Sequence, residues 1–152
     1  MLNDLSIDRA RIADREAVVA LLAAQMSEHR VGSECSRLLE VFDNILSDQR
    51  WGFILLARLG TDIVGVAYVA IILSIEHGAP VGWLEELYVR PGQRDLGIGS
   101  ALLSAAINSA REAGVAALDL EVDADHRRAE ALYERFGFQR LPRSRWVKVI
   151  RW

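Results

Sequence analysis

The sequence predicts a mixed α/β fold of the α+β kind, with a mostly antiparallel central sheet of about seven strands and about four flanking helices. Some short apolar segments are bounded by glycine, proline or aspartate, as strands are. Longer segments place apolar residues three and four positions apart, as on one helix face. An antiparallel meander comes first, then strand–helix–strand–helix, then two closing strands. At 152 residues, a single domain over residues 1–152 is expected.

Four segments have the spacing of amphipathic helices. The first begins at Asp14, a good N-cap residue, and is broken by Gly32 and Ser33. The third is closed by Gly114 in the position that favours glycine after a helix. The second, third and fourth helices are expected around residues 38–46, 100–113 and 126–136.

Seven segments are predicted strands, and two pairs of them are predicted hairpins. A turn at 60–62 joins one pair, and Pro142 lies in the turn of the closing pair. The long strand before the third helix and the strand after it form a parallel, right-handed unit by default. The expected strands are 6–12, 51–59, 63–73, 81–90, 115–122, 138–141 and 145–152.

Composition excludes several classes of function. Net charge is −3, with both signs mixed along the chain, so a nucleic-acid partner is not expected. The longest apolar run, 63–73, is too short to span a membrane, and residues 1–4 do not start a signal peptide. The lone Cys35 suits a reducing compartment, so a cytoplasmic location is expected. No His or Cys pair has metal-ligand spacing, so no metal is predicted.

The glycine-containing loop Gln93-Arg94-Asp95-Leu96-Gly97-Ile98-Gly99 lies between a predicted strand and a predicted helix. The first amides of a helix have no intrahelical partner and attract phosphate, and glycine allows close approach. An ordinary strand-to-helix turn explains the pattern equally well. A dinucleotide-binding loop would need a third glycine at Leu102, and a P-loop would need Gly-Lys-Ser/Thr.

A second pattern is Ala129-x-x-Leu132-Tyr133-x-x-x-Gly137-Phe138, on the last helix. By itself it fits a core tyrosine whose hydroxyl reaches the surface. Together with the run from Leu87 to Leu103 and with Leu120-Glu121-Val122, it resembles the GNAT superfamily of N-acetyltransferases. The resemblance covers nearly the whole chain. It implies the GNAT fold with a parallel strand pair at the cofactor cleft, acetyl-CoA as donor, and a primary amine of a small molecule or peptide as acceptor.

The resemblance also assigns roles. Backbone groups of the strand would hold the pantetheine arm and acetyl carbonyl, and the Val89 amide could donate to the oxyanion. Tyr133 would protonate the departing thiolate. His126 stands where family members commonly have an asparagine, which puts one cofactor contact in question. The implied cofactor-binding residues are Leu87, Tyr88, Val89, Arg94, Asp95, Leu96, Gly97, Ile98, Gly99, Ser100 and His126.

An ammonium must lose a proton before it attacks, and a carboxylate can accept that proton. Glu86 and Glu121 are candidates of equal rank, and Glu85 comes behind them. Because neighbours on a strand point to opposite faces, only one of Glu85 and Glu86 is expected to face a given cleft. For any one of these glutamates, a role as a solvated or salt-bridged carboxylate is favoured over catalysis.

The acceptor is not specified by the sequence. The resemblance implies that the first two helices build acceptor specificity. Their glutamates Glu28, Glu34 and Glu40 could attract a polyamine or an aminoglycoside, but a solvated helix face is the favoured interpretation. A non-catalytic acyl-CoA-binding or sensor module on the same fold is the alternative function, and a Rossmann-type nucleotide binder is a third. The closing strands offer an edge and dimers are common in the family, so a homodimer stays open.

Overall fold

The computed structural model describes residues 2–28 and 34–150. The predicted helix break at Gly32 and Ser33 lies outside the described residues. The chain divides into two compact units, residues 1–121 and residues 122–152. No helix within the described ranges combines the length and the apolar character needed to cross a membrane.

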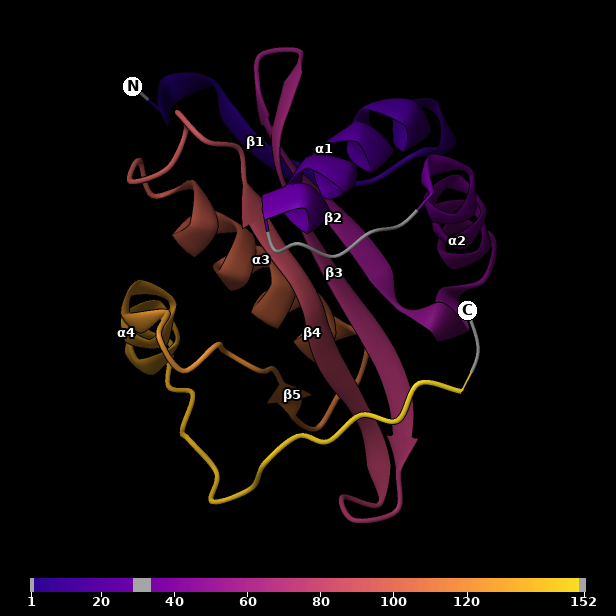
Figure 1. Cartoon of the computed structure of the whole chain (residues 1–152), viewed down its shortest axis with the longest axis vertical. Helices are drawn as coiled ribbons and strands as arrows, with labels where there is room; N and C mark the ends of the chain where they lie inside the picture. Colours follow the sequence, from indigo (N-terminus) through magenta and orange to yellow (C-terminus); the bar gives the residue numbers. More distant parts are fainter. Residues whose placement is uncertain (1, 29–33, 151–152) are drawn as a thin grey trace. The chain divides into compact units, whose positions relative to one another are not determined.

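The first unit is built on a five-stranded sheet with the order β1-β2-β3-β4-β5 (Figure 1). The first four strands are antiparallel neighbours, and β5 runs parallel to β4. The predicted mixed sheet with one parallel pair is therefore confirmed, whereas the seven predicted strands are not. The strands are β1 Leu5–Arg9, β2 Phe53–Leu59, β3 Asp62–Ser74, β4 Ala79–Val89 and β5 Leu118–Asp119.

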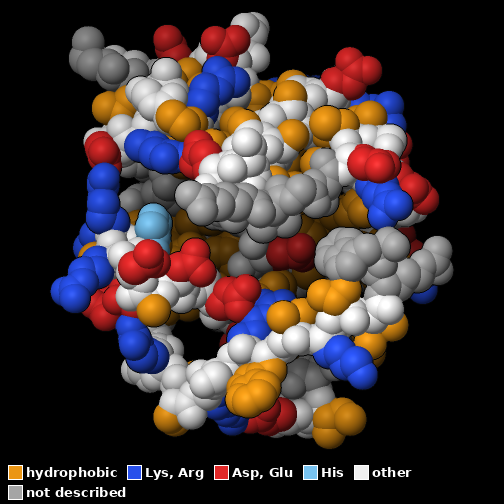
Figure 2. All heavy atoms as spheres, in the orientation of Figure 1, with side chains coloured by type: hydrophobic (Ala, Val, Ile, Leu, Met, Phe, Trp, Pro, Cys, Tyr) orange, Lys and Arg blue, Asp and Glu red, His pale blue; other side chains and the backbone are white. Residues whose placement is uncertain are grey.

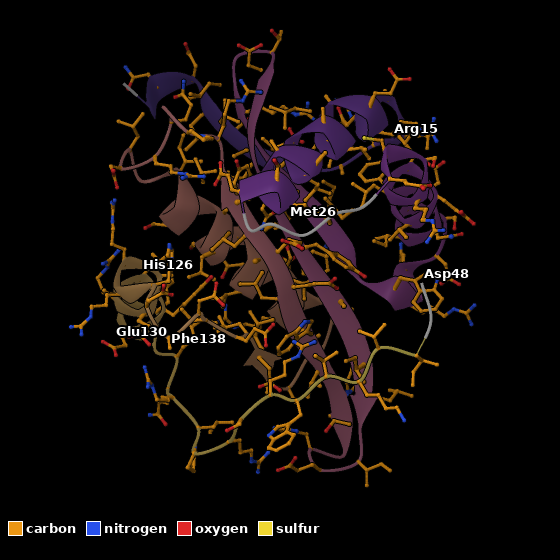
Figure 3. All side chains as sticks on the ribbon, in the orientation of Figure 1. Arg15, Met26, Asp48, His126, Glu130 and Phe138 are labelled. Atoms are coloured by element: carbon orange, nitrogen blue, oxygen red, sulfur yellow. The ribbon has the colours of Figure 1, made fainter. Side chains whose placement is uncertain are left out.

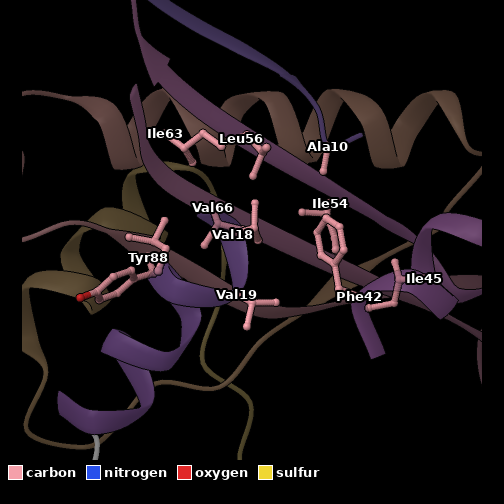
Figure 4. Packing of buried hydrophobic residues seen from close by; sticks show 11 residues of the cluster. Ala10, Val18, Val19, Phe42, Ile45, Ile54, Leu56, Ile63, Val66 and Tyr88 are labelled. Atoms are coloured by element: carbon pink, nitrogen blue, oxygen red, sulfur yellow. The ribbon is translucent and has the colours of Figure 1, made fainter. Parts of the chain in front are cut away.

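Helices cover both faces of this sheet. On one face, residues of α1 (Arg15–Glu28) and α2 (Cys35–Ser47) join sheet residues in the hydrophobic cluster shown in Figure 4. On the other face lies α3 (Ile98–Glu112), which Figure 4 shows running behind the strands. A Cβ added to Gly65 of β3 would lie 2.9 Å from a Leu102 methyl of α3, so this glycine lets the helix approach.

The predicted strand 115–122 is shortened to Leu118–Asp119. It pairs with β4 only at Gly82 and Trp83, and β4 carries an irregularity directly after that point. The ladder between β4 and β5 thus ends next to the irregularity in the β3–β4 pairing. Beyond Trp83, β4 therefore has an edge that β5 does not pair with.

The second unit contains α4 (Arg127–Arg135) and the chain that follows it. No strand forms in the described residues 138–150, so the predicted closing hairpin is wrong there, and residues 151–152 lie outside the described range. Short segments on both sides of Pro142 predict a hairpin, but a strand also needs a partner for its backbone groups. Trp146, Val147 and Ile150 are 90%, 86% and 84% exposed, so their apolar side chains find no core in this unit.

Candidate active site

The predicted phosphate loop follows β4 and leads into α3, as the sequence indicated. Gly97 is the N-cap residue with φ +82°, and Asp95 has φ +66°. Asp95 is the only non-glycine residue with positive φ among the described residues. Left-handed residues in a turn direct neighbouring amides into a concavity that suits an anion. The loop therefore contains two left-handed positions, as anion-binding turns do.

The backbone of β4 beside this loop points along the sheet toward the uncovered edge. The Arg90 N–H donates to the Val64 carbonyl of β3 at 2.8 Å. Because backbone groups alternate in direction along a strand, those of Val89 and Leu87 point away from β3. They face the side on which β5 pairs only with Gly82 and Trp83. A ligand arm lying along this edge could hydrogen-bond to them as another strand would.

Arg94 joins the loop to the strand and to α1. Its Nε donates to the Val89 carbonyl at 2.8 Å, and its Nη2 donates to the Glu28 carboxylate at 3.0 and 3.3 Å. Its guanidinium carbon lies 5.3 Å from the centre of the Tyr88 ring. Three of the predicted cofactor residues are thus in direct contact.

Tyr88 of β4 also belongs to this group, and its side chain lies on the α1 face of the sheet. Figure 4 shows its ring at the edge of the hydrophobic cluster, with the hydroxyl directed away from it. The hydroxyl donates to Glu28 Oε1 at 2.6 Å. Burial, and then the hydrogen bond to Glu28, raise the pKa of Tyr88. Glu28 was considered in the sequence only as one of several acceptor-side glutamates, and a contact with Arg94, 66 positions away, leaves no local signal.

The two adjacent glutamates of β4 lie at a β-bulge. Tyr68 of β3 is opposite Glu86, while the next residue, Val69, is opposite Leu84, so Glu85 is the extra residue. A bulge interrupts the alternation of side chains. With Leu84 on the α3 face and Glu86 beside Tyr68, Glu85 and Glu86 both fall on the α1 face. The expectation that they point to opposite faces is therefore wrong.

Electrostatics agree with this placement of Glu85. Burial, and then the negative charge of Glu85, raise the pKa of Tyr68 to about 12. The Tyr68 hydroxyl donates to the Trp51 carbonyl at 2.8 Å. Glu85 is exposed and Glu86 is half-buried. Glu121, the remaining candidate base, is exposed and lies two residues beyond the end of β5.

The tyrosine pattern has a local structural explanation in the second unit. Gly137 follows α4 with φ +87°, and the amides of Phe136 and Phe138 donate to the Tyr133 carbonyl at 3.0 Å. This turn brings the Phe138 ring edge-on to Tyr133, with 5.6 Å between ring centres. Burial raises the pKa of Tyr133, so its phenol is kept protonated.

His126 is the N-cap residue of α4, and its side chain makes no capping hydrogen bond. It is exposed, and Figure 3 shows it at the helix that also carries Glu130. Glu130 forms an ion pair with Arg140. The candidate Tyr133 and His126 thus come from one short helix.

Charges and metal-binding residues give no further site. On the face drawn in Figure 2, basic and acidic side chains of the coloured residues are interspersed. The part of the chain that the structure describes contains no cluster of three His, Cys, Asp or Glu residues suited to a metal ion. A hollow in the first unit, lined partly by Ser109, Glu112 and Ala113, lies at the opposite end of α3 from the phosphate loop.

The sequence matches the model of the acetyltransferase (GNAT) family over residues 17–138. It is 32% identical over 136 residues to the mycothiol acetyltransferase of Renibacterium salmoninarum, and the aligned region covers 84% of this chain and 38% of that protein. It is 27% identical over 135 residues to YhfO, an uncharacterized N-acetyltransferase of Bacillus subtilis, which covers 89% of this chain and 90% of that protein. The chain thus spans less than half of the first relative and most of the second.

Solved structures share the arrangement. An integron cassette protein from the mobile metagenome of Cole Harbour Salt Marsh is 26% identical, with a TM-score of 0.86 over 95% of this chain and 90% of that one. The aminoglycoside N-acetyltransferase AAC(6')-Iy in complex with CoA is 18% identical, with a TM-score of 0.83 over 95% of this chain and 94% of that one. The second likeness concerns the fold alone.

Proposed function

Because the chain belongs to the acetyltransferase (GNAT) family, we propose that it is an N-acetyltransferase that moves an acetyl group from acetyl-CoA to a primary amine of a small molecule or peptide. We propose that residues 1–152 act as one such domain. The observation that carries the proposal is the pairing of the anion-suited loop at the start of α3 with the outward backbone groups of Leu87 and Val89. A cytoplasmic location and a homodimer stay predictions from the sequence.

The residues present fit the donor. The first amides of α3, from Ile98 to Ser100, would hold the pyrophosphate at the positive end of the helix dipole, and Arg94 would add a full charge. Leu87 would hydrogen-bond the pantetheine arm through its backbone, and the Val89 N–H would serve the acetyl carbonyl, since the Val89 carbonyl already accepts from Arg94 Nε. These contacts do not depend on a metal ion or on another cofactor.

When bound, acetyl-CoA supplies a thioester carbonyl for direct attack by the amine. The nitrogen would form a bond to the acetyl carbon and lose its extra proton to water, while the carbon–sulfur bond breaks and the sulfur leaves as a thiolate. The Val89 N–H would donate to the negative charge that develops on the carbonyl oxygen. Tyr133, whose raised pKa keeps its proton, would give that proton to the thiolate.

A carboxylate would take the proton of the ammonium. Glu86 is half-buried on the α1 face, and the bulge adds Glu85 to the same face, so these two side chains can act on one acceptor. We favour Glu86, because it is half-buried on the α1 face, whereas Glu85 and Glu121 are exposed. Glu121 stays an alternative on the neighbouring strand.

A thiol-release assay across a panel of amines with acetyl-CoA tests the proposal. Release of CoA with at least one amine, and a calorimetric binding signal for CoA, are expected. Absence of CoA binding would contradict the proposal. Binding of CoA without release in the presence of any amine in the panel would favour the non-catalytic acyl-CoA-binding module.

A further inference from the structure

Glu28 connects the proposed donor site with α1. It is the last residue of α1, and its carboxylate accepts hydrogen bonds from the Tyr88 hydroxyl and from Arg94 Nη2. The pair with Arg94 is accessible, since the Arg94 and Glu28 side chains are 45% and 37% exposed. Arg94 thus already has an anionic partner at the place where the pyrophosphate is proposed to bind.

Two anions would therefore compete for one guanidinium. Phosphate groups bind arginine through two parallel hydrogen bonds, which a carboxylate at 3.0 and 3.3 Å to a single nitrogen does not match. The Arg94 Nε is fixed by the Val89 carbonyl, so the side chain is anchored while Nη2 changes partner. Donor binding would then leave the Glu28 carboxylate without this positive neighbour.

Hydrogen-bond acceptors gather on the same stretch of α1. Gln25 is only 7% exposed, and its Oε1 has no hydrogen-bond partner among the described residues. Gln25 lies between Leu21, a residue of the hydrophobic cluster, and Glu28 on the helical stripe that faces the sheet. An amide oxygen and a carboxylate accept hydrogen bonds, and an alkyl ammonium offers three donors. A buried oxygen without a partner is costly, which points to a ligand that donates to it.

We propose that Glu28 and Gln25 bind an ammonium group of the acceptor, and that Arg94 holds Glu28 until the donor pyrophosphate takes over the guanidinium. The inference rests on the proposed function. The reacting nitrogen must be neutral when it attacks, so the ammonium bound by Glu28 is a second charged group of the same acceptor. The preferred substrate class is therefore a diamine or a larger polycationic amine.

The proposed competition of Glu28 and the pyrophosphate for Arg94 is tested by calorimetric titration of CoA into wild type and Glu28→Gln. The amide keeps an oxygen for Tyr88 but removes the charge that competes for Arg94. Glu40→Gln is the matched control, because Glu40 is exposed on α2 and its replacement changes net charge equally. Glu28→Gln is expected to bind CoA about two- to fivefold more tightly than Glu40→Gln, as suits an ion pair of this exposure. Pantetheine, which lacks the pyrophosphate, is expected to bind both variants equally.

Each outcome decides a separate point. Equal CoA affinity of the two variants would overturn the inference and leave the proposed function intact. Binding of CoA by none of the proteins would overturn the proposed function and this inference with it. In an Arg94→Gln background, Glu28→Gln is expected to have no effect on CoA affinity. If Glu28→Gln still raised CoA affinity there, Glu28 would not act through Arg94, and the inference would be overturned.

The proposed ammonium site at Glu28 and Gln25 is tested with putrescine, a diamine, and n-butylamine, a monoamine of similar length. Putrescine is expected to bind the CoA-saturated wild type more tightly than the ligand-free protein, and CoA affinity should rise by the same factor in saturating putrescine, because coupling is reciprocal. Glu28→Gln should lower kcat/KM for acetylation of putrescine at least threefold. It should leave kcat/KM for n-butylamine unchanged, because the single nitrogen of n-butylamine cannot occupy the ammonium site while it reacts. An equal loss of kcat/KM for both amines, or no binding of putrescine in the presence of CoA, would overturn the proposed ammonium site.

Discussion

Arg94 Nε donates a 2.8 Å hydrogen bond to the Val89 carbonyl, and this bond ties the loop before α3 to the last residue of β4. The loop is thereby held beside the strand edge whose backbone groups point outward. Binding a long ligand with a phosphate at one end and an amide-containing arm at the other needs both parts in fixed relation. The predictions below separate the loop, the proposed acid and the stability of the scaffold.

Gly99→Glu is expected to weaken CoA binding at least tenfold. Gly99 is the second residue of α3, so the new carboxylate would stand at the helix end where the pyrophosphate is proposed. Calorimetric titration of CoA measures the change. Ser104→Glu adds the same charge at an exposed position of α3 and serves as the control. Similar losses in the two variants would argue against a phosphate site at the start of α3.

Tyr133→Phe is expected to bind CoA as wild type does, while kcat falls by about 10² or more, since only the phenol proton is removed. Steady-state kinetics with the best amine of the panel measure it. Phe138→Leu is the matched control, because it removes the ring packed against Tyr133 and keeps the hydroxyl. Its stability should fall with kcat largely preserved. A Tyr133→Phe enzyme with unchanged kcat would exclude Tyr133 as the acid.

Asp14→Asn is expected to lower the free energy of unfolding by about 2 kcal/mol at pH 7. The Asp14 carboxylate accepts hydrogen bonds from Arg58 Nη2 and the Arg11 amide, both at 2.8 Å, and the Asp14 and Arg58 side chains are 9% and 12% exposed. Without the Asp14 charge, Arg58 keeps only one of these two carboxylate partners, Asp8. Urea denaturation measures the loss.

This loss should depend on pH in a defined direction. The hydrogen bond from Arg58 is the largest cause that lowers the pKa of Asp14, so the folded state binds the proton less tightly than the unfolded state. The stabilisation is complete above the unfolded pKa, near 4, and disappears as the pH falls through the folded pKa. Wild type and Asp14→Asn should therefore converge in strongly acidic solution. Exposed Asp62→Asn should show neither effect, and a pH-independent difference would point to packing instead.

Gly52→Ala is expected to destabilise the protein by more than about 2 kcal/mol, or to prevent folding. Gly52 has φ +103°, and a Cβ there would lie 1.9 Å from the Val69 carbonyl oxygen of β3. Gly60→Ala has the strained φ of +59° but no atom within 4 Å of the new Cβ, so it should cost only about 1 kcal/mol. Denaturant titration of both variants separates steric overlap from backbone strain, and equal losses would contradict the overlap.

Local patterns predicted much of the first unit. Apolar spacing and flanking glycines placed α3 within two residues of its observed start and one of its observed end, and placed β3 and β4 within two residues. The glycine loop was also recognised, because the turn needs residues that tolerate positive φ, and Gly97 adopts it. These features depend on neighbours in the sequence.

Features that depend on distant partners were missed. The bulge at Glu85 is a property of the register between β3 and β4, which the sequence of β4 alone does not specify. The contact of Glu28 with Arg94 joins residues far apart in the chain. Residues 145–150 are rich in apolar residues and are predicted to form a strand, yet they pair with no strand among the described residues. Periodicity reports which face a side chain would use, and pairing decides whether the strand exists.

Main-chain groups of β4 point along the sheet edge and several of its side chains point to the α1 face, so a substitution in β4 changes the second set and not the first. The outward groups of Leu87 and Val89 belong to the main chain, which every amino acid supplies, whereas Glu85, Glu86 and Tyr88 present side chains to the α1 face. Substitutions on that face can reshape what the protein accepts and leave the main-chain edge in place. Libraries that vary residues 85, 86, 25 and 28 should therefore yield altered amine preferences among variants that still bind CoA.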